Sequence, residues 1–423
     1  MALDQEQRRR LQAEVDELGR RGLRVLAIAE RTMPAPASGA QPSSDVPNLD
    51  SVDGLTLLGL VGLYDPPRPD VAAAIAACRD AGIRVVMVTG DHAVTAASIA
   101  CSISLASAPQ VIEGRALADG RGLSAASLRN ADVLARVTPA QKLELVWAYQ
   151  SAGEVVAMTG DGVNDAPALR KADIGVAMGL RGTEVARQAA AMVLRDDSFA
   201  TIVSAIREGR VIFANIRRFV LYLLACNLSE VMVVAIAVTA GLPLPLLPLQ
   251  ILFLNLVTDV FPAFALAMGE GGGDVLRRPP RDPREPIVTR RLWSLVLAQG
   301  FAMTLATLAA MVLARDGLGL GGGAVVTVSF LTLALAQIWH VLNMADPGQP
   351  LLRNDVTRNP YVWGAVLVCL GLIGIACYLP PLAAVLGLAA PGAQGWLIVV
   401  ATSLSAMVLG RIAAVVLGRA SMR

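Results

Sequence analysis

Two patterns of apolar residues divide this chain of 423 residues close to Ser198. Before this point, short apolar runs of strand length alternate with amphipathic stretches of helical period, which is typical of an α/β domain with a parallel sheet. The predicted strands are Leu57–Leu63, Val85–Thr89, Val155–Thr159, Ile174–Ala177 and Met192–Leu194. Beyond it, long apolar segments follow one another, and most approach the ~20 residues needed to cross a bilayer. We expect six spans, at about Val211–Ala240, Leu246–Met268, Leu292–Ala314, Ala324–Leu342, Val362–Tyr378 and Trp396–Val416.

The beginning of the chain has a pattern of its own. Residues 1–32 predict a charged helix followed by a strand at Leu23–Ala29. Residues 33–50 contain four prolines and no periodicity, which predicts a flexible connection. The N-terminal letters MALDQEQRRR show no secretory signal, so we expect the first part of the chain in the cytoplasm.

The composition supports the membrane interpretation. A hydrophobic fraction of 55% and a mean hydropathy of +0.57 are too apolar for an ordinary soluble protein. The net charge of +2 offers no basic surface for nucleic acid, which we set aside as a partner. The five cysteines have no CxxC spacing, which argues against disulfides and against ligation of soft metals.

Basic residues indicate the orientation of the spans, because Lys and Arg collect in short loops on the cytoplasmic side of a membrane. Arg217 and Arg218 stand at the start of the first span, and six arginines between positions 277 and 291 join the second span to the third. Arg353 and Arg358 join the fourth to the fifth, whereas the three opposite connections hold one basic residue together. We therefore expect both ends of the chain in the cytoplasm, and a bacterial plasma membrane as the location.

The segment Thr159–Leu169, TGDGVNDAPAL, is the most specific motif in the chain. It follows a predicted strand, its glycines allow a tight turn, and Asp161 and Asp165 lie four residues apart with Asn164 between them. Carboxylate oxygens suit Mg²⁺, which needs only one or two of them beside water and phosphate. A bare GDG would more often be a turn with a capping role, but the full string is far more specific.

Two further segments offer groups for phosphate. Thr89-Gly90-Asp91 ends an earlier strand, and its hydroxyl and backbone amides could bind phosphate oxygens, although alone it is an ordinary helix cap. Lys142 lies at the start of an amphipathic helix and could neutralise charge on a phosphoryl group, although a lone helix lysine is usually just solvated. Since ligands bind outside the carboxyl ends of parallel strands, the two Thr-Gly-Asp turns are expected to meet in one site.

Taken in order, DPPR, VTGD, TPAQK and TGDGVNDAPAL resemble the phosphorylation domain of P-type cation-transporting ATPases, a member of the haloacid-dehalogenase superfamily. The resemblance implies a Rossmann-like phosphorylation domain over 55–200, a C-terminal remnant of the nucleotide-binding domain over 1–54, and a stalk with six transmembrane helices over 201–423. It implies ATP and Mg²⁺ as cofactors, with Asp161 as the Mg²⁺ ligand. It also implies supporting, phosphate or nucleotide-side roles for Asn164, Asp165, Thr89, Gly90, Asp91, Lys142, Asp65 and Arg68.

One departure from the family concerns the nucleophile. The family phosphorylates the Asp of a DKTGT motif, and no such motif stands in this sequence. The resemblance then implies an N-terminal chain or segment that supplies this aspartate and the actuator domain. The alternative is a catalytically silent membrane protein, from a truncated or split gene, that at most binds ions or complements a partner.

Polar residues interrupt the first two spans at helical spacing. Asn227 and Glu230 are separated by three residues, and Asn255, Thr258 and Asp259 by three and four, so each set shares a helix face. A carboxylate at mid-membrane costs about 2.5–3.5 kcal/mol, which makes the two acidic residues candidates for function. Hydrogen bonds between helices would explain Asn227 or Thr258 alone, but they do not explain Glu230 and Asp259 together. Oxygen ligands of this kind describe a site for a hard cation.

The letters CNLSE and NLVTDVFPA resemble the calcium-pump branch, in which the matching positions bind the transported ion. Gln337 stands where two-site pumps carry a glutamate, so we expect one divalent ion per cycle, Ca²⁺ or Mn²⁺. Na⁺ and H⁺ stay open as alternatives. His340 is interpreted as an interfacial residue, not a ligand.

Overall fold

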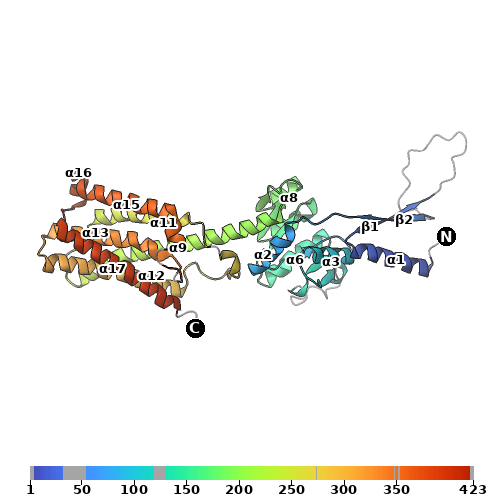
Figure 1. Ribbon diagram of the computed structural model, residues 1–423, viewed down its shortest axis with the longest axis horizontal. Coiled ribbons are helices and arrows are strands. Elements are labelled where there is room, and N and C mark those ends of the chain that lie inside the picture. The colour runs from blue at the N-terminus through green and yellow to red at the C-terminus, as the bar shows by residue number, and fades with distance from the viewer. Residues whose placement is uncertain are drawn as a thin grey trace. The chain divides into compact units, whose positions relative to one another are not determined.

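The computed structural model describes residues 4–31, 54–118, 129–272, 274–346, 348–350 and 353–419 (Figure 1). These residues form two compact units, which are described separately. The first comprises Met1–Ile206 with Leu276–Pro280, and the second comprises Arg207–Val275 with Arg281–Arg423. The connection predicted at 33–50 lies outside the described residues. The domain boundaries expected from sequence, at 54 and 200, stay predictions.

The first unit contains two parallel sheets of three strands each. In one sheet the order is β3 (Met87–Val88), β5 (Val133–Ala135), β4 (Val111–Glu113), and in the other it is β6 (Ala157–Gly160), β7 (Ile174–Met178), β8 (Met192–Leu194). All pairs in both sheets are parallel. The helices between the strands are α2 (Val71–Asp80), α3 (Ala93–Ser102), α4 (Gly114–Ala118), α6 (Pro139–Ser151), η2 (Val163–Asp165), α7 (Ala166–Lys171) and α8 (Glu184–Ala189). The predicted parallel α/β class is therefore confirmed.

One predicted strand has a different partner from the one expected. β2 (Thr56–Leu63) pairs with β1 (Arg24–Glu30) in an antiparallel ribbon of two strands, apart from the parallel sheets. The helix α1 (Gln5–Arg20) precedes this ribbon, and Asp4 caps it by accepting a hydrogen bond from the Gln7 amide. An apolar run predicts a strand but carries no information about the direction of its neighbour.

The second unit is a bundle of helices. They are α9 (Phe199–Thr239), which begins in the first unit, α10 (Pro248–Leu254), η3 (Asn255–Asp259), α11 (Val260–Ala267), η4 (Val275–Arg277), of which only Val275 belongs to this unit, α12 (Arg290–Val312), η5 (Leu313–Gly317), α13 (Gly322–His340), η6 (Val341–Met344), α14 (Asp355–Arg358), α15 (Pro360–Tyr378), α16 (Pro380–Leu386) and α17 (Gly392–Arg419). Within the described ranges, six helices are long and apolar enough to cross a membrane, as the sequence predicts. The protein is an integral membrane protein.

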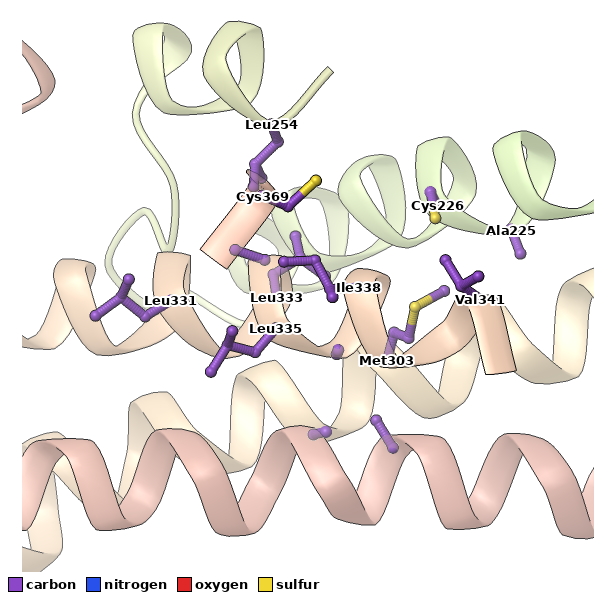
Figure 2. Packing of buried hydrophobic residues seen from close by; sticks show 14 of the residues in the cluster. Ala225, Cys226, Leu254, Met303, Leu331, Leu333, Leu335, Ile338, Val341 and Cys369 are labelled. Atoms are coloured by element: carbon purple, nitrogen blue, oxygen red, sulfur yellow. The ribbon is translucent and has the colours of Figure 1, made fainter. Parts of the chain in front are cut away.

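The helix α13 lies at the centre of this bundle. Its apolar residues belong to one continuous core, and Figure 2 shows part of it, with Leu331, Leu333 and Ile338 among side chains from other helices. Phe330 and Ile338 have no exposed surface. Because α13 is covered on nearly every side, its polar residues Gln337 and His340 lie in the interior of the bundle, where they need partners. His340 is 2% exposed. Its expected position at a membrane interface stays a prediction.

Candidate functional site

The Asp161 turn follows β6 directly, at the carboxyl end of the strand. A Cβ atom at Gly160 would lie 2.6 Å from Cβ of Asp165, so only glycine allows the chain to turn here. Asp161 is exposed, its carbonyl oxygen accepts a hydrogen bond from the Thr183 amide at 2.8 Å, and its carboxylate has no partner among the described residues. A free carboxylate at this end of a parallel strand fits a Mg²⁺ ligand.

Lys142 and Asp165 form an ion pair beside this turn. The Lys142 ammonium donates to Oδ1 of Asp165 at 2.6 Å, and Oδ2 accepts from the Gly162 amide at 3.2 Å. The lysine is held in place because Thr138 caps α6 with a capping box and Pro139 occupies the first turn. Asp165 is 7% exposed, so its carboxylate is committed to the turn, while the neighbouring Asn164 is exposed.

The other Thr-Gly-Asp turn, after β3, is closed on itself. The Thr89 hydroxyl donates to Asp91 at 2.9 Å and accepts from the Asp91 amide at 3.1 Å. Within the described residues no hydrogen bond joins this turn to Asp161. Instead, the amides of Arg136 and Val137 donate to the carbonyl oxygens of Asp91 and Thr89. Residues 136–142 therefore connect the first turn to the ion pair at the second.

Asp197 holds a loop that reaches Asp161, and sequence reasoning missed it. Its Oδ1 accepts from the amides of Gly179 and Leu180 at 2.7 and 2.9 Å, and its Oδ2 accepts from the Arg181 amide at 2.9 Å. These three N–H groups, the Leu180 amide first, lower the pKa of the Asp197 carboxyl. The loop ends at Thr183, the residue that donates to Asp161. In the sequence, the pair Asp196-Asp197 before a long helix matches no motif that would indicate a functional role.

The DPPR segment lies next to the start of α9. Arg68 donates from its guanidinium to the carbonyl oxygen of Asp197 at 2.6 Å, while Asp65 is exposed. Among the described residues, neither side chain contacts the Asp161 turn. Their nucleotide-side roles stay predictions.

In the second unit, Asn227 on α9 meets Asp259 on η3. The Asn227 amide donates to Oδ2 of Asp259 at 3.0 Å and to the carbonyl oxygen of Leu223. The other carboxylate oxygen of Asp259 is buried and has no partner among the described residues. This hydrogen bond joins α9 to η3 inside the bundle.

Glu230 belongs to a second group that also includes α13. The Gln337 amide donates to Oε1 of Glu230 at 3.0 Å, and its oxygen accepts from the Thr258 hydroxyl at 2.7 Å. The Tyr222 hydroxyl donates to the carbonyl oxygen of Thr258 at 2.7 Å and to that of Gln337 at 3.3 Å. Tyr222 is fully buried and was not predicted, because a tyrosine in an apolar segment reads as part of the core.

The segment Asn255–Asp259 is a π-helix between two α-helices. Such wide turns are rare and occur often at functional sites, because they shift side chains and carbonyl oxygens out of α-helical register. Here Oδ1 of Asn255 and Oδ1 of Asp259 are buried without partners among the described residues. The described residues contain no group of three or more His, Cys, Asp and Glu placed to hold a metal.

Two family models match the chain. Residues 243–416 match the C-terminal region of cation-transporting ATPases. Residues 10–173 match haloacid dehalogenase-like hydrolases. The two matches leave residues 174–242 between them.

Similar curated proteins carry related names. A calcium-transporting ATPase of Bacillus subtilis is 43% identical over 403 residues, which are 94% of this chain and 44% of the relative. A cation-transporting ATPase of Synechocystis is 39% identical over 86% of the chain and 40% of the relative. An endoplasmic reticulum calcium ATPase of Aspergillus fumigatus is 45% identical over 70% of the chain and 31% of the relative. The chain thus spans less than half the length of each. It belongs to the P-type cation-transporting ATPases and corresponds to their C-terminal portion.

Proposed function

We propose that this chain is the ion-binding and C-terminal part of an ATP-driven pump that carries Ca²⁺ across a membrane, with Mn²⁺ as the alternative ion. The observation that carries the proposal is the set of oxygen atoms from Glu230, Asp259, Asn255 and Thr258 inside the membrane bundle, two of them buried without partners. The calcium-transporting names of two relatives support Ca²⁺ over Na⁺.

The first unit would take part in phosphoryl transfer from ATP. Bound Mg²⁺ would neutralise charge on the transferred group, and the free carboxylate of Asp161 is the ligand that this chain offers it. Lys142, fixed by Asp165, would present its ammonium to the same phosphate, and the Thr89 hydroxyl and Gly90 amide would donate to it. The aspartate that accepts the phosphoryl group would come from an upstream segment or an N-terminal chain. The soluble unit and both termini would face the cytoplasm.

We further propose that one ion is bound per cycle. Gln337 donates its amide hydrogen to Glu230 and accepts from Thr258, so it is a neutral bridge at the place where an additional carboxylate would add charge for another ion. Two carboxylates, Glu230 and Asp259, balance one divalent cation.

Equilibrium binding of ⁴⁵Ca²⁺ to the full chain in lipid nanodiscs tests the ion site, with Mn²⁺ and Na⁺ as competitors. We expect one Ca²⁺ per chain, displaced by Mn²⁺ far better than by Na⁺. Asp259→Asn should weaken binding at least about tenfold, roughly 1.4 kcal/mol. Asp316→Asn is the matched control, because this aspartate of η5 has a side chain 63% exposed. Unchanged binding in Asp259→Asn would contradict the site.

A test of the proposed role in ATP hydrolysis requires the aspartate of a DKTGT motif, which this sequence does not contain. ATP hydrolysis is measured after the chain is joined to, or mixed with, a polypeptide that carries DKTGT and the actuator domain. Ca²⁺-stimulated hydrolysis that disappears in Asp161→Asn is expected. Ca²⁺ binding without any hydrolysis would favour the silent alternative.

A further inference from the structure

Two amide side chains in the membrane bundle have buried polar atoms without hydrogen-bond partners among the described residues. Gln299 on α12 is 1% exposed, and neither its Oε1 nor its Nε2 has a hydrogen-bond partner among the described residues. Asn343 in η6 is 4% exposed, and its Oδ1 is likewise unpaired, while its Nδ2 donates to the carbonyl oxygen of Met407 at 3.0 Å. Unpaired polar groups are costly in a membrane interior, so they call for a ligand.

Both amides gather around Gly410 of α17. A Cβ atom at Gly410 would lie 2.8 Å from Nδ2 of Asn343 and 3.7 Å from Cγ of Gln299. Glycine at this position therefore lets the side chains of Asn343 and Gln299 pack closely against the backbone of α17. The three unpaired atoms of these two residues come from α12 and η6.

The unpaired groups continue a line of polar residues that starts at the cation site. Gln337, His340 and Asn343 follow one another at intervals of three residues, and such residues are neighbours on an α-helix and eclipse each other on a 3₁₀-helix such as η6. The Nε2 atom of His340 is also buried without a partner among the described residues, and its ring stacks on Tyr222 with 5.9 Å between centroids. Gln337 at the other end bonds to Glu230.

The chemistry of these atoms selects the ligand. Gln299 Nε2 is a donor, whereas Gln299 Oε1 and Asn343 Oδ1 are acceptors, and neither residue carries a charge. A cation would meet the N–H group, and an anion would meet the two oxygens. Water both donates and accepts, and buried waters make about three hydrogen bonds to otherwise unsatisfied groups. We propose that Gln299 and Asn343 bind ordered water, in a hydration site separate from the transported ion.

Radiolytic labelling of the full chain in nanodiscs with ¹⁸O water tests this site. Radicals form from water and oxidise side chains next to it, so a buried methionine is labelled only where water is bound nearby. Met303 lies four residues after Gln299 on the same helix face and is 2% exposed, whereas Met311, further along α12, is 1% exposed. We expect Met303 to be labelled several-fold faster than Met311. Equally slow labelling of both would overturn the proposal.

The variant Gln299→Leu with Asn343→Leu removes the unpaired atoms. Labelling of Met303 should then fall to the rate of Met311. Ser329→Ala is the matched control, because this buried hydroxyl donates within its own helix, to the carbonyl oxygen of Val325, and its loss should leave Met303 labelling unchanged. Persistent labelling of Met303 in the folded double variant would contradict the site. If the double variant does not fold, Gln299→Leu alone is judged by the same two rates.

Discussion

The side-chain amide of Gln337 donates a hydrogen bond to the carboxylate of Glu230 across 3.0 Å, deep inside the helix bundle. Gln337→Glu would replace this donor by a second carboxylate that repels the first. Losing a hydrogen bond to a charged group costs about 1.5–3 kcal/mol. We expect the variant to be less stable without divalent ions, and Ca²⁺ to raise its melting temperature by more than it raises that of the unchanged chain. Melting curves with Ca²⁺ and with chelator measure both effects, and an equal Ca²⁺ effect would contradict the expectation.

The pair Lys142–Asp165 is the next test. Lys142→Met would leave the Asp165 carboxylate, 7% exposed, without its counter-ion. Removing one partner of a largely buried pair should destabilise the first unit by about 2–4 kcal/mol. The double variant with Asp165→Asn should recover part of this loss, because the uncompensated charge is gone. A double-mutant cycle on urea unfolding of the purified chain measures the interaction energy between Lys142 and Asp165. If the losses of the two single variants simply add, this ion pair does not contribute to stability.

The loop before α8 leaves no room for a side chain at Gly182. A Cβ atom there would lie 1.9 Å from the carbonyl oxygen of Met178, a backbone atom that cannot yield. Gly182→Ala should cost about 1–3 kcal/mol or more, as overpacking does. Gly209→Ala is the matched control, because Gly209 lies in α9 with open space around its Cβ position. The control should gain about 0.5–1 kcal/mol. Equal thermal stability of the two variants would contradict the observed packing.

Asp197 predicts how stability responds to acid. The amides of Leu180, Arg181 and Gly179 lower the pKa of its carboxyl in the folded chain. The unfolded chain then binds a proton first, near pH 4, so the contribution of Asp197 is fully present above that pH and is lost as pH falls through the lower folded pKa. Asp197→Asn should therefore reduce stability at pH 7 and make it less sensitive to acid. Thermal melts of the unchanged chain and of Asp197→Asn from pH 7 to pH 3 measure this difference. Parallel curves of melting temperature against pH would contradict the expected role of Asp197.

The transmembrane helices and the motif strands were predictable because their signals are long or repeated. Six apolar segments, each about long enough to cross a bilayer, are best explained as membrane spans. The strands β6, β7 and β8 are short apolar runs next to recognisable turns. By contrast, β4 and β5, of three residues each, were not predicted, although β8 has the same length. The antiparallel partner of β2 depends on a contact between distant residues, which periodicity does not encode.

The candidate site was predictable where a charge stands in an apolar segment. Glu230 and Asp259 are visible in the sequence for this reason, and the structure places each beside a partner on a neighbouring helix. Tyr222 and Asp197 were not predictable from the sequence. Tyr222 donates to the carbonyl oxygen of Thr258, and Asp197 accepts from three backbone amides of a loop. Backbone partners of this kind depend on the fold, not on residue type.

Among the described residues, each parallel sheet of the first unit has one strand, β3 or β6, that pairs with a neighbour on one side only and ends in a Thr-Gly-Asp turn. The unpaired N–H and C=O groups of such an outer strand are a template for any extended peptide that meets it. A purified sample should therefore be prone to association between molecules through these strands. The same property makes each of them a place where one added strand would extend the sheet by ordinary backbone hydrogen bonds.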